Sequence, residues 1–477
     1  MNKRLLLYPL IIGVFGSLIW LIIKLGSDLP VKPLTDAGTS ITASSPAAIA
    51  GAEQSSWAQL VHNLQHPLSL LLLQIIVIVL VARIFGMLAG KIKQPAVVGE
   101  IIAGVILGPS LLGWVAPDFS AFLFPADTKS LQFLSQIGLA FFMFIVGMEL
   151  DLAKIRHKAH DAVMISHASI IVPFFLGVSL AYFIYEQFAP ANISFLSFAL
   201  FMGIAMSITA FPVLARIVQE RHLTGTPLGI MAITCAAADD ITAWCMLAAV
   251  VAIVKAGSVL SALVTIALAA LFVAAMLYVI RPWLQRTIQR QAIKGHHKAT
   301  VSLVFFILLI SAWLAEIIGI HALFGAFLAG VIMPQEISIR KLLTDKLEDV
   351  SVLLLLPIFF AYTGLRTHIG LLTQGHLWVV FVMIMLVAVS GKFGASTITA
   401  RLMGQPWHQA VSIGALMNTR GLMELVVLNI GYDLGILSPE IFAMMVLMAL
   451  ATTFMTGPLL DLVNWSVKRK NWSAGLG

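Results

Sequence analysis

Asp239 and Asp240 are adjacent acidic residues near the centre of an apolar run that extends from residue 225 to 254. If this run crosses a bilayer, each aspartate costs about 2.5 to 3.5 kcal/mol, and such residues usually mark ion or proton pathways. Successive helical positions differ by about 100°, so the two carboxylates cannot face one partner equally well. We expect one to face a water-filled cavity and the other to pair inside the protein.

Lys392 lies in the middle of another apolar run, 376–402, and is the expected partner of one aspartate. Removing one member of such a buried pair would strand the other charge at a cost of several kcal/mol. A nearby cation favours an ionised carboxylate, whereas desolvation favours the protonated form. This balance predicts a carboxylate that exchanges protons. The alternative is that the buried charges only lock the helices together.

Two further runs contain residues that disturb a helix at membrane depth. SITAFPVLARIV (207–218) contains Pro212, which removes a backbone donor. MNTRGLMEL (417–425) places polar groups and a permissive backbone where lipid cannot satisfy them, at Asn418, Thr419, Arg420 and Gly421. The two segments occupy matching positions in the two halves of the chain. Ordinary kinked helices are the alternative to a shared interruption.

Glu424 lies four residues after Arg420, so the two side chains share one helix face. The two side chains pair with each other, or Glu424 lies on an ion path. Glu100 and Glu149 lie at the ends of runs, where a solvated or capping role is at least equally expected.

The composition places the chain in a membrane, and the sequence lacks signals typical of soluble enzymes. Of 477 residues, 60% are hydrophobic and 11% are charged, and the mean hydropathy is +0.99. The net charge of +7 comes from short connections, which indicates membrane topology and no nucleic-acid partner. Phosphate-binding, CxxC and HExxH motifs are absent from the sequence. We expect no enzyme activity, no cofactor and no attached nucleotide-binding domain.

The order of the apolar runs predicts the domain organisation. Residues 1–25 are interpreted as a signal anchor or signal peptide, and residues 26–66 as a flexible extracytoplasmic linker. Thirteen runs follow, at 67–86, 96–115, 130–149, 161–185, 194–217, 225–254, 258–281, 299–318, 320–334, 350–365, 376–402, 407–431 and 438–463. Basic residues gather in alternate connections, including expected loops at 281–298 and around Arg340, which places these connections and the C-terminus in the cytoplasm.

The runs from 67 to 254 and from 299 to 463 begin on opposite sides of the membrane, with 258–281 as a connector. Two halves of opposite orientation predict an inverted repeat, an architecture common in secondary transporters. We therefore expect an all-α polytopic protein of the inner (plasma) membrane. One transmembrane domain would cover 67–463, followed by a short basic tail at 464–477.

Six strings carry a family resemblance, in order along residues 67 to 463. They are QPAVVGEIIAGVILGPSLLG (94–113), FFMFIVGMELD (141–151), SITAFPVLARI (207–217), AADDITAW (237–244), GIHALFGAFLAGVIMP (319–334) and NTRGLMELVVLNIG (418–431). Together they resemble monovalent cation:proton antiporter family 2, which includes bacterial sodium/proton and potassium/proton antiporters and plant and fungal cation/proton exchangers.

The resemblance implies thirteen core spans, two crossed interrupted helices, a homodimer, and a six-helix core domain that moves like an elevator against a dimerisation domain. By position, Asp240 matches the carboxylate that carries the ion and proton, and Asp239 matches the preceding motif position. Lys392 matches the lysine that neutralises that carboxylate. The crossed-helix region corresponds to Ser207, Thr209, Asn418 and Thr419.

Asp239 departs from the plant exchangers, which commonly have Asn there, and two acids are typical of electrogenic sodium/proton exchange. The expected function is antiport of Na⁺ or K⁺ against protons, with both ions as substrates and Asp240 as the metal-ion ligand. A channel-like or uniport cation pathway and a membrane sensor without transport activity are the alternatives.

Overall fold

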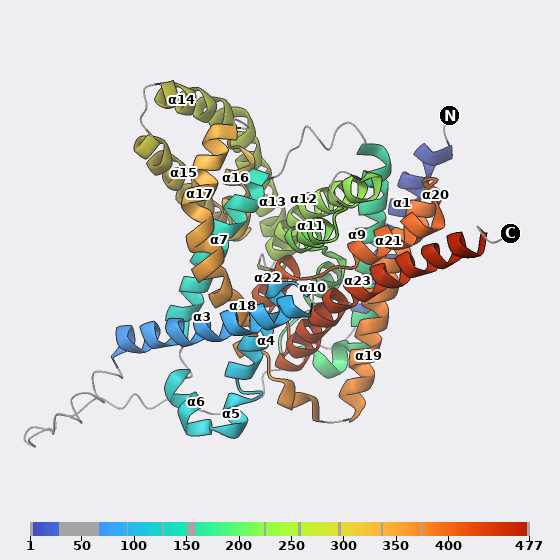
Figure 1. The fold of residues 1–477 in the computed structure, drawn as a ribbon, viewed down its shortest axis with the longest axis horizontal. Coiled ribbons are helices and arrows are strands. Elements are labelled where there is room, and N and C mark those ends of the chain that lie inside the picture. The colour runs from blue at the N-terminus through green and yellow to red at the C-terminus, as the bar shows by residue number, and fades with distance from the viewer. Residues whose placement is uncertain are drawn as a thin grey trace, which may run out of the picture.

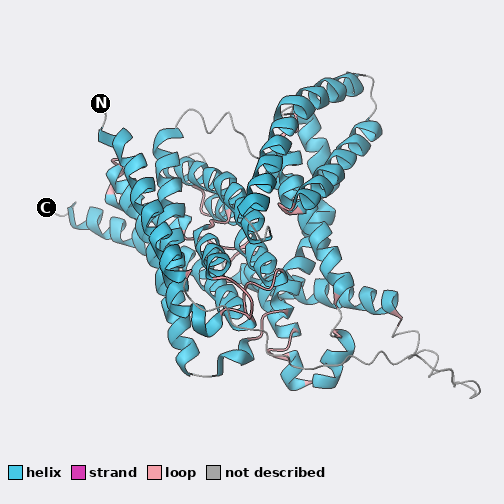
Figure 2. Ribbon diagram, turned by 180° about the vertical axis from the view of Figure 1, so that it is seen from behind, coloured by secondary structure: helices cyan, strands magenta, loops and turns pink. Residues whose placement is uncertain are grey.

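The computed structural model describes residues 3–27, 66–92, 94–125, 128–149, 159–223, 226–255, 259–293, 297–334, 337–373 and 375–474. Throughout these residues the regular structure is helical and strands are absent (Figure 2). Twelve of the described helical segments are long and apolar enough to cross a membrane. The expected all-α membrane fold is therefore confirmed.

The first half contains α3 (Pro67–Lys91), α4 (Ala96–Leu107), α7 (Lys129–Glu149), α9 (Ala159–Phe188), α10 (Phe195–Ser207), α11 (Phe211–Glu220) and α12 (Pro227–Lys255). The short helices α5 (Leu112–Val115) and α6 (Pro117–Leu123) follow α4. The connector runs through α13 (Val259–Ala275), the π-helical turn η1 (Met276–Ile280) and α14 (Arg281–Ile293).

The second half contains α15 (His297–Ile318), α16 (Ala322–Val331), α17 (Ile337–Val350), η2 (Ser351–Leu355), α18 (Leu356–Leu365), η3 (Ile369–Thr373), α19 (Gly375–Val389), η4 (Ser390–Gly394), α20 (Ala395–Leu402), α21 (Trp407–Met417), α22 (Leu422–Asp433) and α23 (Pro439–Ala474). The run expected at 320–334 forms the short α16, which extends about 15 Å at 1.5 Å per residue.

Two connections and the C-terminal tail differ from the sequence expectation. The basic segment expected as a loop after residue 281 is α14, and the segment around Arg340 is α17. Helix α17 contains neither Gly nor Pro, and the one Pro of α14, Pro282, comes just after the π-helical turn η1, in the first turn of α14. Helix α23 continues through residue 474, into the expected tail. Most of the expected linker, residues 28–65, lies outside the described residues.

The N-terminal apolar run forms α1 (Lys3–Gly26), which packs against α9 and α10. The rings of Phe15 and Phe175 meet edge to face with centroids 5.1 Å apart, so this contact is an aromatic pair. Figure 1 shows α1 beside α9, with both chain ends on the same side of the molecule.

Six helices form a group that we call the scaffold: α3, α4, α7, α15, α16 and α18. Helix α4 packs against α18, and the equivalent helix of the second half, α16, packs against α7. Both crossings require glycine. A Cβ on Gly104 would lie 2.2 Å from the carbonyl oxygen of Ala361, and one on Gly147 would lie 2.2 Å from that of Phe327. The matching contacts in the two halves agree with an internal repeat.

The remaining spans form a second group, the core bundle: α9 to α12 and α19 to α23. Its helices pack closely on each other, whereas its most extensive direct contacts with the scaffold are α18 with α22 and α4 with α23. Figure 1 shows α7, α15, α16 and α17 on one side and α9, α10 and α20 to α23 on the other. The two interrupted segments, at 195–219 and 407–433, are the most buried of the candidate spans.

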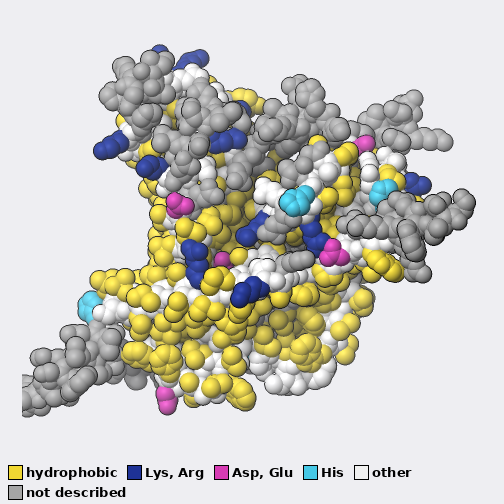
Figure 3. All heavy atoms as spheres, in the orientation of Figure 1, with side chains coloured by type: hydrophobic (Ala, Val, Ile, Leu, Met, Phe, Trp, Pro, Cys, Tyr) yellow, Lys and Arg dark blue, Asp and Glu magenta, His cyan; other side chains and the backbone are white. Residues whose placement is uncertain are grey.

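The surface separates into apolar and basic regions. On the face seen in Figure 3, hydrophobic side chains cover most of the lower part, while Lys and Arg side chains lie in the upper part and across the middle. The basic helix α14 lies at the upper edge and α5 and α6 lie at the lower edge of the same view in Figure 1. We call the end with α5 and α6 the outer end, as the positive-inside rule predicts.

Candidate functional site

Both interrupted segments contain a real break, and the two breaks touch. Helix α10 ends at Ser207 and α11 begins at Phe211, after an extended stretch. Pro212 occupies the first turn of α11, where backbone N–H groups have no intrahelical acceptor, so its missing N–H costs no hydrogen bond. The backbone N–H of Ala210 donates to the Thr419 carbonyl at 3.1 Å, and the Thr209 hydroxyl donates to the Met417 carbonyl at 3.1 Å.

The second break depends on Gly421. Its φ of 157° and ψ of −128° lie in a region that residues with a side chain rarely adopt, and a Cβ there would lie 3.0 Å from Cγ2 of Val213. Helix α23 supports this segment, because the hydroxyl of Thr453 donates to the Arg420 carbonyl at 2.5 Å. Thr419 and Thr456 also share a hydrogen bond of 3.1 Å between their hydroxyls.

Asp239 is buried and fully engaged. One carboxylate oxygen accepts hydrogen bonds from the Ser169 hydroxyl at 2.9 Å and from the Ser166 hydroxyl at 3.5 Å. The other accepts from the backbone N–H of Thr209 at 3.0 Å and from Nζ of Lys392 at 3.0 Å. These donors come from α9, the first helix break and η4, so Asp239 ties three parts of the core bundle together.

Lys392 pairs with Asp239 and not with Asp240, which corrects the assignment that the family resemblance implied. Its ammonium also donates to the carbonyls of Ser169, at 3.2 Å, and Ser207. All three ammonium hydrogens therefore have acceptors. The residue lies in the π-helical turn η4, which comes close to α9 because Gly391 packs against Pro173. The broader expectation, that Lys392 would pair with one aspartate, agrees with this contact.

Asp240 is also fully buried, but neither of its carboxylate oxygens accepts a hydrogen bond from the described residues. Phe211, the first residue of α11, lies near this carboxylate, and its backbone N–H is one of those that a helix N-terminus leaves without an intrahelical acceptor. The side-chain amide of Asn418, at the second break, is likewise buried without a described partner. Oxygen atoms of this kind are the ligands that hard cations prefer.

Arg420 joins the second break to the end of α10. Its guanidinium donates to the carbonyls of Ala205 at 2.9 Å and Met206 at 2.8 Å, the positions at which a helix C-terminus lacks intrahelical partners. Its Nη1 also lies 3.2 Å from Oε1 of Glu424, and both side chains are fully buried. The pairing of these two residues, one of the two sequence alternatives, is therefore present in the structure.

The remaining predicted positions serve mainly to shape the breaks. The Ser207 hydroxyl donates to the carbonyls of Gly203 and Ile170, while its own carbonyl accepts from Lys392. Sequence reasoning missed Ser166 and Ser169, whose spacing of three on α9 places both hydroxyls toward Asp239. Among the described residues, no cluster of His, Cys, Asp and Glu side chains has the geometry of a resident metal site.

Comparisons with known proteins give the family. Residues 76–463 match the family described as "Sodium/hydrogen exchanger, transmembrane". The "Na(+)/H(+) antiporter NhaS4" of Synechocystis sp. is 43% identical over 395 residues, which cover 82% of this chain and 96% of the relative. The "Cation/H(+) antiporter 17" of Arabidopsis thaliana is 39% identical over 83% of this chain and 48% of the relative.

The "K(+)/H(+) antiporter 1" of Saccharomyces cerevisiae is 35% identical over 84% of this chain and 47% of the relative. The chain therefore spans about half the length of the plant and yeast relatives, at 48% and 47%. The sodium proton antiporter MjNhaP1 of Methanocaldococcus jannaschii has the same fold, with a TM-score of 0.59 at 13% identity over 83% of this chain and 97% of that chain. By the match over 76–463 and the identity to the Synechocystis relative, this chain belongs to the sodium/hydrogen exchanger family.

Proposed function

We propose that this protein is a secondary active antiporter that exchanges a monovalent cation, Na⁺ or K⁺, for protons. Membership of the family and the names of its relatives, which include sodium/proton and potassium/proton antiporters, support cation/proton antiport. The observation that carries the residue assignment is the fully buried Asp240 carboxylate, which lacks a hydrogen-bond partner among the described residues beside the first helix break.

Burial explains why Asp240 couples the two ions. An ionised carboxylate without a partner is unstable in a protein interior, so it must bind either a proton or a cation before it is enclosed. One carboxylate cannot hold both occupants at once. Release of the proton is therefore required for cation binding, and the competition couples the two fluxes. The backbone of Phe211 lies near this carboxylate at the first break, and the amide of Asn418 is the buried side chain without a described partner at the second break.

Alternating access follows from the division into scaffold and core bundle. The core bundle contains both breaks, Asp239, Asp240 and Lys392, while its direct contacts with the scaffold are few. We propose that the core bundle slides against the scaffold like an elevator and presents Asp240 to each side in turn. The scaffold would also form the homodimer in the plasma membrane, with the C-terminus in the cytoplasm.

The decisive test is proton flux in proteoliposomes that contain the purified protein and a pH-sensitive dye. The native protein is expected to move protons when a gradient of Na⁺ or K⁺ is imposed, and titration with each alkali cation gives the selectivity. Asp240→Asn should reduce this flux to that of protein-free liposomes, because the amide cannot bind a proton or neutralise a cation.

Asp461→Asn is the matched control, since Asp461 lies on the exposed side of α23 and pairs with Arg221 away from both breaks. It should retain native flux. Persistent flux in Asp240→Asn would refute the assignment. Downhill cation flux without any uphill movement driven by protons would instead identify a channel-like pathway, and no flux of either ion under any gradient would favour a sensor.

A further inference from the structure

Arg366 connects the scaffold to the core bundle at the outer end of the molecule. It follows α18, and its guanidinium donates to Oδ1 of Asn429 at 3.1 Å and to Oδ1 of Asp433 at 2.5 Å. Both acceptors belong to α22 of the core bundle. A charge-assisted contact of this kind is stronger and more directional than a neutral hydrogen bond.

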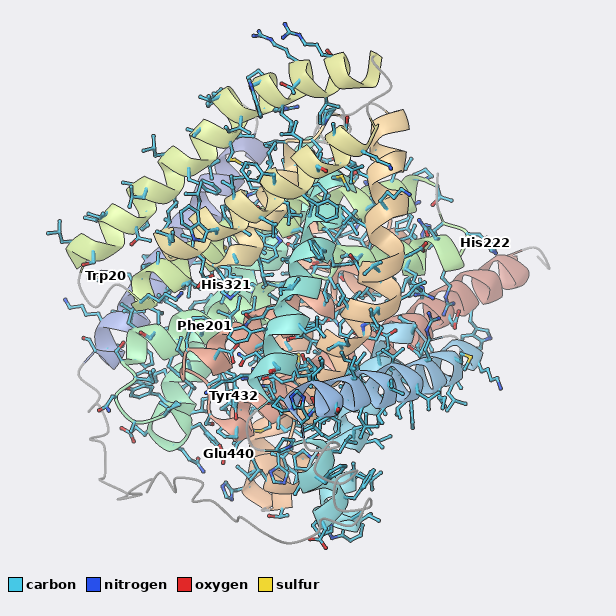
Figure 4. All side chains as sticks on the ribbon, turned by 90° about the vertical axis from the view of Figure 1, so that its left-hand side faces the viewer. Trp20, Phe201, His222, His321, Tyr432 and Glu440 are labelled. Atoms are coloured by element: carbon cyan, nitrogen blue, oxygen red, sulfur yellow. The ribbon has the colours of Figure 1, made fainter. Side chains whose placement is uncertain are left out.

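Aromatic rings hold the same guanidinium on two sides. The centroid of the Tyr362 ring, on α18, lies 4.8 Å from Cζ of Arg366, and that of Tyr432, on α22, lies 4.9 Å away. The amide of Asn429 also donates to the hydroxyl of Thr363 on α18 at 2.8 Å. Helix α18 therefore supplies one ring and one hydrogen-bonding side chain, and α22 supplies one ring and two hydrogen-bonding side chains. In Figure 4, Tyr432 lies between His321 and Glu440, toward the lower end of the view.

Two cavities meet at Arg366 and Tyr362. The outer one is open and has a volume of about 360 Å³, with walls that include Pro109 after α4, Ser120 of α6 and Thr128 just before α7. The inner one has only about 20 Å³, enough for roughly one water molecule. The inner cavity lies between α7 and α22, and its polar lining includes Gln132, Ser135, Gln136, Asn429 and Asp433. Arg366 and Tyr362 line both cavities.

Helix α22 links this point to the candidate ion site. It begins directly after the break at Gly421 and ends at Asp433, so its 12 residues extend about 18 Å. Val426 and Ile430 line the inner cavity from this helix. Asn429 and Asp433 belong to the helix that begins directly after the second break. A displacement of the core bundle that moves this break must therefore also move both residues.

We propose that Arg366, Tyr362, Asn429, Tyr432 and Asp433 form an outer gate, which closes the route from the outer cavity to the ion site in the structure described here. The inference rests on the proposed alternation of the core bundle. Opening requires α22 to move away from α18, which separates the guanidinium from its two acceptors and from the Tyr432 ring. Joining the inner and outer cavities would then give hydrated cations access along α22.

The test measures access to the inner cavity and does not require transport. Ser135, which is buried and lines that cavity, is replaced by Cys in a protein whose Cys235 and Cys245 are changed to Ala. A membrane-impermeant methanethiosulfonate reagent is added to one side of the membrane at a time. The thiol should react slowly with reagent on the outside. Arg366→Gln should accelerate that reaction at least about tenfold, the change that a loss of about 1.4 kcal/mol in the closed state produces.

Asp433→Asn provides a second variant that weakens the gate from the α22 side, and it should also accelerate labelling. Exchange of the charges, Arg366→Asp with Asp433→Arg, should restore part of the protection. Asp461→Asn is the control, because it breaks an ion pair between the end of α11 and α23, both within the core bundle. That variant should leave the labelling rate unchanged.

Three results would overturn the gate: fast outside labelling with Arg366 intact, unchanged labelling in both Arg366→Gln and Asp433→Asn, or labelling only from the cytoplasmic side. These results are separable from failure of the proposed antiport. If Asp240→Asn retained proton flux, the ion-site assignment would fail, whereas the gate would still be judged by thiol labelling alone.

Discussion

At the scale of single residues, the two adjacent aspartates have different environments. Asp239 accepts from four donors, one of which is the ammonium of Lys392, whereas Asp240 has no hydrogen-bond partner among the described residues. The opposite charges of Asp239 and Lys392 offset each other in an ion pair, whereas Asp240 has no ion-pair partner among the described residues. A buried pair of this kind is costly to break but can often be replaced by neutral residues of similar volume.

This difference predicts the outcome of a double-mutant experiment. Lys392→Met leaves the Asp239 carboxylate buried without its cation and should destabilise the protein by about 3 to 5 kcal/mol. Combining it with Asp239→Asn should recover most of that loss. Thermal unfolding in detergent gives the comparison, and Ser166→Ala, which removes only a 3.5 Å contact, should change the midpoint little. Additive losses in the double variant would show that the two residues do not act as a pair.

At the scale of elements, the site is built from two helix ends that face each other. The bonds Ala210 to Thr419 and Thr209 to Met417 join the breaks, and Arg420 closes the end of α10 through its last carbonyls. Polar backbone at membrane depth is tolerated because the opposite break and the α23 hydroxyls satisfy it. The crossed breaks therefore provide backbone groups without intrahelical partners next to Asp239 and Asp240.

Gly421→Ala tests this arrangement. A side chain in that backbone region costs about 1 to 3 kcal/mol, and the added Cβ would press on Val213, so the melting temperature and the cation-dependent proton flux should both fall. Gly90→Ala is the matched control, because a Cβ on that glycine of α3 would meet no described atom within 4 Å. Equal behaviour of the two variants would show that the break does not need glycine.

At the scale of the whole molecule, the proposed sliding of the core bundle carries charge across the membrane. If two protons exchange for one cation, each cycle moves one net charge, which is worth about 2.3 kcal/mol per 100 mV. Asp240 accounts for one proton. The adjoining pair Asp239–Lys392 is the nearest group that could account for the second, since its members are in direct contact at 3.0 Å.

Asp239→Asn should therefore reduce the charge moved per cation. The measurement is current or membrane-potential change in proteoliposomes, divided by the cation flux in the same preparation. Ser166→Ala, which keeps both charges, is the control and should retain the native ratio. An unchanged ratio in Asp239→Asn would remove Asp239 from the charge-carrying step.

The sequence by itself determined the class of fold and the depth of the important residues. Hydrophobic runs of about 20 residues specify membrane spans, and a charge or a proline inside such a run is visible without any structure. The breaks around Pro212 and Gly421 followed from local chemistry. Helical spacing placed Arg420 and Glu424 on one face, and their pairing was one of two alternatives. The polar helices α14 and α17 could not be predicted from the sequence, because they lack the hydrophobic run that identified the spans.

Only the tertiary structure decided which aspartate Lys392 contacts. It also decided that Arg366 joins α18 to α22. Asp239 and Asp240 are neighbours in sequence but point in directions about 100° apart on a helix. The choice between them depends on which helix packs on which face of α12, and distant segments supply those faces. Contacts between residues 153 or 67 positions apart have no local signal, since they arise from packing of whole helices.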